Sequence, residues 1–598
     1  MSVKKHYCNP INIDYRYQFN MDQRVGVLQI NREAADPSMV YYQGKYYVFA
    51  SMQLKVWESE NLMDWKSYPL PKELPLYDYA PDVRVIGDYL YFCASKREEK
   101  CDYYRTKDVI NGPYEKIEGT YPFWDPHVFE DEDGKVYFYY GCSNVTPIYG
   151  VEVDPVTFLP KGERKELIFG HPYEIGYERI GENNSEYPRS DEEIEMMFQN
   201  FVKQQGRPIE EIPADYIPLI KAMFTNRPYI EGPWMNKHNG KYYLQYACPG
   251  TQYNTYADGV YVSEHPLGPY VLASNNPFSY KPGGFITGAG HGSTMEDAKG
   301  NMWHISTMRI STHHMFERRV GLWKAGFDEE GELYCDQRFG DWPINIESKP
   351  FENPDWYLLS YQKPVQVSSC SGDNKKENAV DENIRTWWQA STNEPGEWIC
   401  VDLEKEMMVH AIQINFADDM IDEQPAGEIQ GTTQARWIDD RNHVTRWKLE
   451  ISSDGKVWQE IENKENATTD LSHDLVVCEE GMKTRFVKLT IFEVPLHQKP
   501  CISGLRIFGK GEGALPKVPQ YHVDRTSDLD MRITIEGDAK GYLILWGKEE
   551  TKLYHSYETF QKEQVVPALL KGESYYVCVD AWNENGITTG EIQKVEAK

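Results

Sequence analysis

Short segments of alternating polar and apolar residues dominate the first part of the chain, and one sequence motif recurs in them five times. Each copy opens with a polar residue, continues as a strand, turns at a glycine in most copies and returns as a second strand, which is the pattern of a β-hairpin. The copies run over 36–51, 81–95, 125–141, 231–246 and, more loosely, 292–306. Such recurrence indicates a repeat architecture.

A second hairpin follows most copies, as in 56–68 and 261–270. Two hairpins make a four-stranded blade, so five units predict a five-bladed β-propeller within residues 1–345. The innermost strand of each blade lines the central channel, and all five strands start at the same mouth. We therefore expect acids that are far apart in sequence to meet in one depression. The residues near those starts are Asp36, Asp82, Asp125, Glu231 and His291.

An insertion at about 163–226 interrupts the spacing between the third and fourth copies. Within it, Ser190 and Glu193 form a capping-box pattern, and apolar residues follow at helical spacing over 194–202. We expect a small helical excursion that either shapes the pocket or braces the rim of the propeller.

The composition changes after Pro343. Residues 358–510 have the alternation of a β-sandwich, for example in 397–403 and 410–416. Residues 518–598 contain more short strands, typical of a small immunoglobulin- or fibronectin-type III-like sandwich. The predicted fold class is all-β: a five-bladed β-propeller followed by two β-sandwich domains, with a small helical insertion in the propeller.

The net charge and the cysteine pattern limit which binding partners and which cell compartment we expect. The formal net charge of −30 repels phosphate backbones and anionic lipid headgroups, so neither nucleic acid nor a membrane surface is an expected partner. No stretch approaches the ~20 apolar residues that span a bilayer, and no secretory signal is visible. The 11 cysteines lack paired spacing, which argues against a disulfide framework or a zinc site. We expect a cytoplasmic protein.

The acids at the predicted channel mouth fit glycoside hydrolysis by inversion. This reaction needs one ionised carboxylate to deprotonate water and one protonated carboxyl to release the leaving oxygen. Asp36, Asp125 and Glu231 are the candidates. Three like charges around one pocket also raise at least one pKa, which suits a general acid working near neutrality.

The same three positions carry a resemblance to a known family. Ala35-Asp36-Pro37, Asp125-Pro126 and Glu231-Gly232-Pro233 resemble the three signature positions of glycoside hydrolase family 43, in the same order and each at a propeller repeat. The resemblance implies Asp36 as general base and Glu231 as general acid. It implies that Asp125 tunes the pKa of the acid and orients it.

Other positions resemble the family's substrate pocket. Tyr79 and Asp82 lie in a matching second-blade motif, although Asp82 is as readily a turn residue. Trp124 forms a wall of the sugar pocket or part of the core, and Arg309 clamps substrate or pairs with the acids. His291 resembles a channel histidine, implying a calcium ion linked through water or a hydrogen-bonded core histidine.

The middle domain resembles a discoidin, or coagulation-factor type C, module. The matching segments include 378–381, 386–388 and 504–509. Glu382 stands where the family usually has glycine, which weakens the expectation of a structural calcium site in this loop. The module either binds glycans or braces the propeller, and a brace is the better expectation for an enzyme of soluble oligosaccharides. No cofactor is expected to be required.

These features predict an exo-acting hydrolase of plant-polysaccharide oligosaccharides. The family resemblance implies α-L-arabinofuranosidase or β-xylosidase activity, with the former favoured. A β-galactofuranosidase on the same site and a non-catalytic glycan-binding propeller are the alternatives. A sialidase-like propeller is less consistent, since it needs a tyrosine nucleophile and an arginine cluster.

Overall fold

The computed structural model describes residues 4–22, 26–71, 74, 79–95, 102–117, 123–206, 208–430 and 435–598. Five antiparallel sheets form the propeller of the first domain, four with four strands and one with six. Blades 1 and 2 consist of β4 (Ser38–Tyr42), β5 (Lys45–Phe49), β6 (Lys55–Ser59) and β7 (Lys66–Pro69), then β8 (Tyr79–Ile86), β9 (Tyr89–Ser95), β10 (Tyr103–Thr106) and β11 (Glu115–Ile117). Blade 3 consists of β12 (His127–Glu130), β13 (Val136–Tyr140), β15 (Ile148–Val153) and β16 (Lys165–Ile168).

Blades 4 and 5 complete the ring. Blade 4 contains β17 (Ile230–His238), β18 (Lys241–Cys248), β19 (Ala257–Ser263) and β20 (Val271–Leu272), extended by β14 (Cys142–Ser143) and β21 (Ser279–Tyr280). Blade 5 contains β22 (Thr287–Glu296), β23 (Met302–Arg309), β24 (Arg318–Phe327) and β25 (Leu333–Asp336). The inner strands β4, β8, β12, β17 and β22 contact one another in turn, and β22 returns to β4. The propeller is therefore closed, as predicted.

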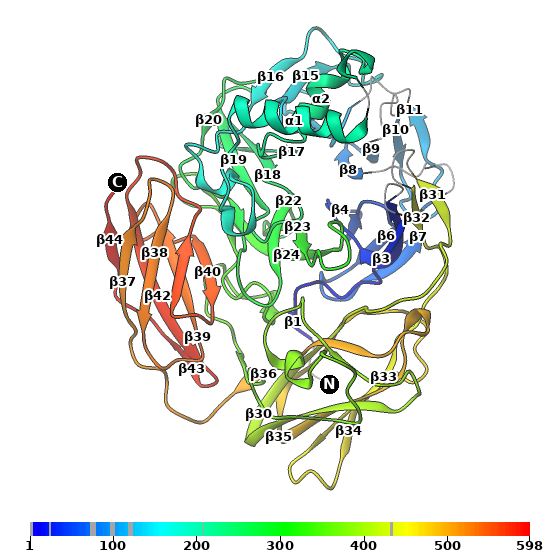
Figure 1. The fold of residues 1–598 in the computed structure, drawn as a ribbon, viewed down its shortest axis with the longest axis vertical. Helices are drawn as coiled ribbons and strands as arrows, with labels where there is room; N and C mark the ends of the chain where they lie inside the picture. The colour runs from blue at the N-terminus through cyan, green and yellow to red at the C-terminus, as the bar shows by residue number, and fades with distance from the viewer. Residues whose placement is uncertain are drawn as a thin grey trace.

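The insertion carries the two α-helices of the described chain, α1 (Asp191–Gln205) and α2 (Tyr216–Ala222), which lie together at the edge of the propeller (Figure 1). Ser190 caps α1 and forms the predicted capping box with Glu193. Phe198 and Val202 bury the apolar side of the helix. No described helix has the length and apolar character needed to cross a membrane. Single-turn helices complete the helical structure: η1 (Gly176–Glu178), η2 (Glu182–Asn184), η3 (Ile209–Glu211), η4 (Lys376–Val380) and η5 (Pro495–His497).

Two β-sandwich domains follow the propeller (Figure 1). The middle domain contains β27 (Tyr357–Leu358), β28 (Val365–Val367), β29 (Trp388–Gln389), β30 (Glu397–Phe416), β33 (Arg446–Ser452), β34 (Gln459–Asn463), β35 (His473–Glu493) and β36 (Cys501–Lys510). The C-terminal domain contains β37 (Gln520–Arg525), β38 (Met531–Glu536), β39 (Gly541–Gly547), β40 (His555–Thr559), β41 (Glu563–Val566), β42 (Tyr575–Asn583), β43 (Gly586–Thr588) and β44 (Gln593–Val595). These domains and the helical insertion confirm the predicted fold class.

Two short sheets tie the first residues of the chain to later segments. β1 (His6–Tyr7) pairs with β26 (Ile344–Asn345), directly after blade 5. The hairpin of β2 (Arg16–Asp22) and β3 (Val27–Glu33) is not part of blade 1, an arrangement that the repeat pattern did not predict. It pairs instead with β32 (Ala435–Ile438), which continues to β31 (Glu428–Gln430), an excursion from the middle domain.

The three domains are packed against one another through shared cores. Trp342 after blade 5 contacts Phe508 of the middle domain and Trp582 of the C-terminal domain, with ring centroids 5.8 and 4.9 Å away. Arg506 of β36 pairs with Asp341 at 2.8 Å in the same buried region. The sandwiches are therefore fixed to the propeller rather than tethered.

Candidate active site

The inner strands of all five blades begin with the same backbone feature. One residue near each start, from two residues before the strand at Asp36 and Asp125 to the fifth residue of β22 at His291, has a φ between 48° and 56°. This is the left-handed region, which residues other than glycine rarely adopt. Unusual backbone of this kind concentrates at functional sites. The five positions are Asp36, Ala80, Asp125, Gly232 and His291.

This register corrects one feature of the sequence analysis: Ala80, not Asp82, is the counterpart of Asp36 in blade 2. Asp82 and His127, which lie two residues after Ala80 and Asp125, link neighbouring blades instead. Val128 donates its backbone N–H to Asp82 Oδ2 at 2.7 Å, and the imidazole of His127 lies 3.0 Å from Oδ1. Met235 in turn donates its N–H to His127 Nε2 at 3.0 Å. Both oxygens of Asp82 are thus engaged between blades, which leaves its predicted substrate contact without support.

Asp36 is held through both carboxylate oxygens. Ser51 Oγ donates to Oδ2 at 2.8 Å, and Arg318 Nη1 donates to Oδ1 at 3.2 Å. The backbone N–H of Asp36 donates to Thr307 Oγ1 at 2.8 Å. Burial raises the pKa of this carboxyl, but Arg318, His291 and the two hydroxyls outweigh burial and lower it. Asp36 is therefore ionised at neutral pH, as a general base must be.

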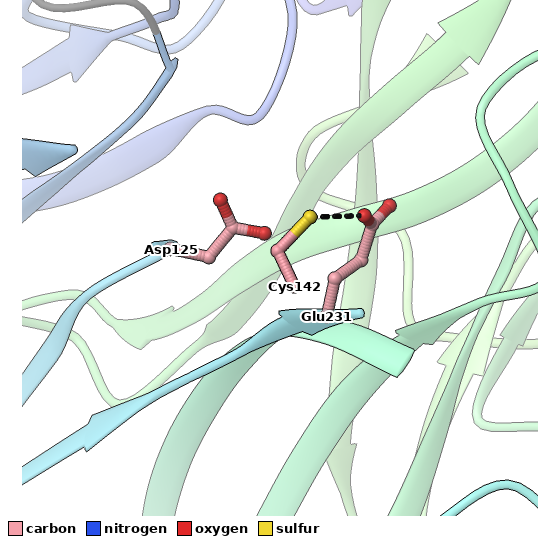
Figure 2. A group of neighbouring side chains, drawn as sticks. All are labelled: Asp125, Cys142 and Glu231. Carbon is pink, nitrogen blue, oxygen red and sulfur yellow. Dashed lines mark hydrogen bonds between the residues drawn. The ribbon is translucent and has the colours of Figure 1, made fainter. Parts of the chain in front are cut away.

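Asp125 and Glu231 lie together with Cys142, and the ligand-type atoms of the three side chains are within 4.8 Å of one another (Figure 2). Backbone pairing of β14 with β17 sets Cys142 opposite Glu231. The thiol donates to Glu231 Oε2 at 3.1 Å, and the hydroxyl of Tyr256 donates to Oε1 at 2.5 Å. Both oxygens of Glu231 are therefore oriented by neighbouring donors.

His291 connects the acids. Its Nδ1 lies 3.4 Å from Asp36 Oδ1 and 3.8 Å from Asp125 Oδ2. Its backbone N–H donates to Asp258 Oδ1 at 2.7 Å, which holds the backbone of β22 at this residue. Burial lowers the pKa of His291, but Asp36, Asp125 and Glu231 outweigh it and raise the pKa. The structure thus brings the three predicted acids together around one imidazole.

The expected repulsion among these acids is concentrated on Asp125. Burial is the largest cause that raises the pKa of Asp125, and the charges of Glu231 and Asp36 raise it further, whereas His291 lowers it. Together they raise the pKa of Asp125 to about 7. The backbone N–H of Gly232 donates to Asp125 Oδ2 at 3.3 Å. A proton therefore remains on Asp125 near neutrality, next to Glu231.

Arg309, Trp124 and Tyr79 are the other residues predicted to contact substrate. Arg309 donates from Nη2 to Glu182 Oε2 at 2.8 Å and from Nε to Thr287 Oγ1 at 3.2 Å. Its buried Nη1 has no hydrogen-bond partner among the described residues. Trp124 is half-buried directly before Asp125, and the Tyr79 side chain lies outside what the structure describes. Substrate contacts by these three residues stay predictions.

The insertion lines a cleft beside the strand that carries Glu231. The cleft has a volume of about 260 Å³ and is bounded by Ser143 and Ile230, the chain neighbours of Cys142 and Glu231, and by insertion residues from Phe169 to Glu174. The side chain of Tyr229, next to Ile230, is 45% exposed. Residues of the insertion therefore lie beside the strand that carries Glu231, in a cleft that the three acids do not line. The role of the helical part in the sugar pocket stays a prediction.

The cluster of ligand-type side chains at the channel mouth is not of the kind that calcium prefers. Among the described residues, the one tight cluster of carboxylate, thiol or imidazole ligand atoms is Asp125, Cys142 and Glu231. Calcium prefers six to eight oxygen ligands, and a thiol is a poor one. In the middle domain, Glu382 is occupied by Arg506, whose Nη2 lies 2.8 Å from Oε2. Calcium at either place stays a prediction.

Comparison with known families agrees with this geometry. Residues 29–178 and 183–333 match the glycosyl hydrolases family 43. The chain belongs to this family. It is therefore a glycoside hydrolase, and its propeller is the family's catalytic domain. Residues 378–489 match the NedA-like, galactose-binding domain, in agreement with the discoidin-type resemblance of the middle domain.

The family-43 relatives are distant in sequence. A xylosidase/arabinosidase of Bacteroides ovatus is 25% identical over 275 residues, covering 40% of this chain and 75% of the relative. Xylosidase/arabinosidase 43A of Humicola insolens is 26% identical over 351 residues, covering 51% and 98%. The crystal structure of a thermostable family-43 glycoside hydrolase is 23% identical, covers 58% of this chain and 100% of its own, and has a TM-score of 0.40.

Sequence reasoning missed three residues of the site. Arg318, Cys142 and Tyr256 contact the predicted acids, yet they do not lie in the repeated sequence motif. They enter from β24, from β14 and from the turn before β19. Only the fold places these segments beside the inner strands, so no local signal in the sequence marks them.

Proposed function

We propose that this family-43 enzyme is an inverting, exo-acting glycosidase that releases arabinofuranosyl or xylosyl residues from oligosaccharides of plant polysaccharides. The observation that carries the proposal is the convergence of Asp36, Asp125 and Glu231 around His291. The relatives named xylosidase/arabinosidase support the choice of pentose sugars. We favour the α-L-arabinofuranoside as the better substrate.

In this mechanism Asp36 is the general base. Its lowered pKa keeps it ionised over the neutral range, and Ser51 and Arg318 fix the orientation of its two oxygens. The base takes a proton from water, which attacks the anomeric carbon on the face opposite the leaving group. Product therefore forms with inverted configuration.

Glu231 is the general acid in the same proposal. Hydrogen bonds from Tyr256 and Cys142 position its carboxyl group, and Asp125 carries a proton nearby at neutral pH. In its protonated form Glu231 gives its proton to the leaving oxygen as the glycosidic bond breaks. Asp125 thus supports the acid in this proposal.

A panel of nitrophenyl glycosides tests the proposal. We expect release from the α-L-arabinofuranoside or the β-D-xyloside, with the β-D-galactofuranoside as the alternative on the same site. Glu231→Gln and Asp36→Asn are each expected to lower kcat by about 10²-fold or more with an unchanged fold. Either variant retaining the wild-type rate on a good substrate would show that its role is misassigned.

The stereochemistry is tested separately. Proton NMR recorded during the first minutes of hydrolysis resolves the anomer that forms before mutarotation. We expect the inverted anomer, and first-formed product with retained configuration would reject the single-displacement mechanism.

A further inference from the structure

The middle domain reaches the propeller next to the predicted base. Its excursion forms β32, which pairs with β2 of the N-terminal hairpin in the register Asn20 to Arg436. β3, the second strand of that hairpin, ends at Glu33, three residues before Asp36. The position of the base is therefore set partly by a sheet that two domains share.

Glu33 is a fully buried carboxylate between two arginines. Arg318 donates from Nε to Glu33 Oε1 at 3.1 Å and also from Nη2, while Arg436 of β32 donates from Nη2 to Oε2. Both guanidinium groups also lie against the ring of Phe316, 4.7 Å from its centroid for Arg318 and 5.5 Å for Arg436. The three charged groups form one packed unit.

Charge balance shows what Arg436 contributes. Asp36 and Glu33 are two buried acids, and Arg318 contacts both. One guanidinium cannot compensate two buried carboxylates, because an unpaired buried charge is costly and draws the remaining cation toward itself. His291 faces Asp36 but is shared with Asp125, and Arg436 supplies a further positive charge on the Glu33 side. Arg318 can then keep its Nη1 on Asp36 while the rest of its guanidinium holds Glu33.

We propose that Arg436, a residue of the middle domain, is a positioning residue for the catalytic base: it neutralises Glu33 so that Arg318 stays on Asp36. The inference rests on the proposed function, since it assigns Asp36 as the base. It gives the middle domain a part in catalysis that does not require glycan binding.

A second contact supports this reading. Arg32, the neighbour of Glu33, points to the other side of β3 and pairs with Asp418 at 2.7 Å and Asp470 at 3.1 Å, both in the middle domain. The middle domain thus holds the end of β3 from both sides.

The test is steady-state kinetics of four variants of the full chain on the best glycoside of the panel. We expect Arg436→Gln to lower kcat about tenfold with KM changed less than twofold, because the base is misplaced while the sugar contacts remain. Arg436→Lys keeps the charge and should recover most of kcat. The double variant Glu33→Gln/Arg436→Gln removes both charges and should exceed the single Arg436→Gln variant in kcat.

Arg441→Gln is the matched control. Arg441 lies in the same excursion, pairs with Asp439 at 2.8 Å, and has a side chain that is 40% exposed. It should retain the wild-type kcat. Melting temperatures identify variants that fail to fold, and the Lys and double variants keep the test decisive in that case.

Two results would overturn this inference but leave the proposed function standing. In the first, the wild type is active and the folded Arg436→Gln variant has the same kcat. In the second, the folded double variant has a kcat no higher than that of the single Arg436→Gln variant. A wild type without turnover on any glycoside would instead refute the proposed function, and this inference with it.

Discussion

Replacing His291 by asparagine should move the whole pH profile of the enzyme upward without changing its width. The imidazole lies between Asp36 and Asp125, and its raised pKa favours the charged form. Asparagine removes this cation from both carboxyl groups at once. The pKa of the base rises, so the ascending limb shifts to higher pH. The pKa of Asp125 also rises above about 7, so the descending limb shifts in the same direction.

The size of the shift follows from the two distances. Coulomb's law with an effective dielectric constant of about 20 gives about 5 kcal/mol for a unit charge at 3.4 Å and about 4 kcal/mol at 3.8 Å. These figures are upper limits, because water fills the vacated space and Arg318 remains on Asp36. A shift of about 1 to 2 pH units is expected for a single lost cation. Since the distances are similar, both limbs should shift by similar amounts.

The assay is kcat/KM between pH 4 and pH 9 on one glycoside, which reports the groups of the free enzyme. His265→Asn, which removes an exposed loop histidine, is the control and should retain the wild-type profile. Circular dichroism checks that both variants are folded. Limbs that move in opposite directions, or a profile that does not move in a folded His291→Asn variant, would refute this electrostatic account.

Three further predictions concern the same site. Gly232→Ala places a Cβ 2.6 Å from the His291 ring at a φ of +56°, so it should lower both kcat and the melting temperature. Gly134→Ala is the control: its φ is +78° and nothing lies within 4 Å of the added Cβ, so it should cost only the backbone strain of about 1–3 kcal/mol. Cys142→Ala removes a donor to Glu231 and should lower kcat severalfold, while Cys142→Ser should stay close to wild type; equal rates for the two would exclude a role for the thiol. Dialysis against EDTA should leave kcat unchanged, and a loss that added Ca²⁺ restores would instead demonstrate a calcium site.

The catalytic acids could be predicted from the sequence because the blade repeat is local. Each hairpin fixes where its own inner strand begins, and Asp36, Asp125 and Glu231 all lie at such starts. The same logic misplaced Asp82 by two residues. In blade 2 the position that corresponds to Asp36 is Ala80, and Asp82 is an acid two residues further along the chain. Backbone conformation, which the sequence does not display, decides the register.

Contacts between segments that are distant in sequence could not be predicted. Arg318 reaches Asp36 of blade 1 from β24 of blade 5, and Cys142 meets Glu231 through a two-residue strand. The pairing of β2 with β32 joins residues more than 400 positions apart. Such contacts depend on how whole domains pack, and neither hydrophobic periodicity nor spacing carries that information.

The aromatic contacts among Trp342, Phe508 and Trp582 bear on how this enzyme can be re-engineered. Because one apolar centre draws side chains from all three domains, the chain should melt in a single transition, and excising either sandwich would strip the propeller of part of its own interior. Grafting a foreign binding module in place of the middle domain would therefore mean redesigning a buried interface, not merely choosing a new linker.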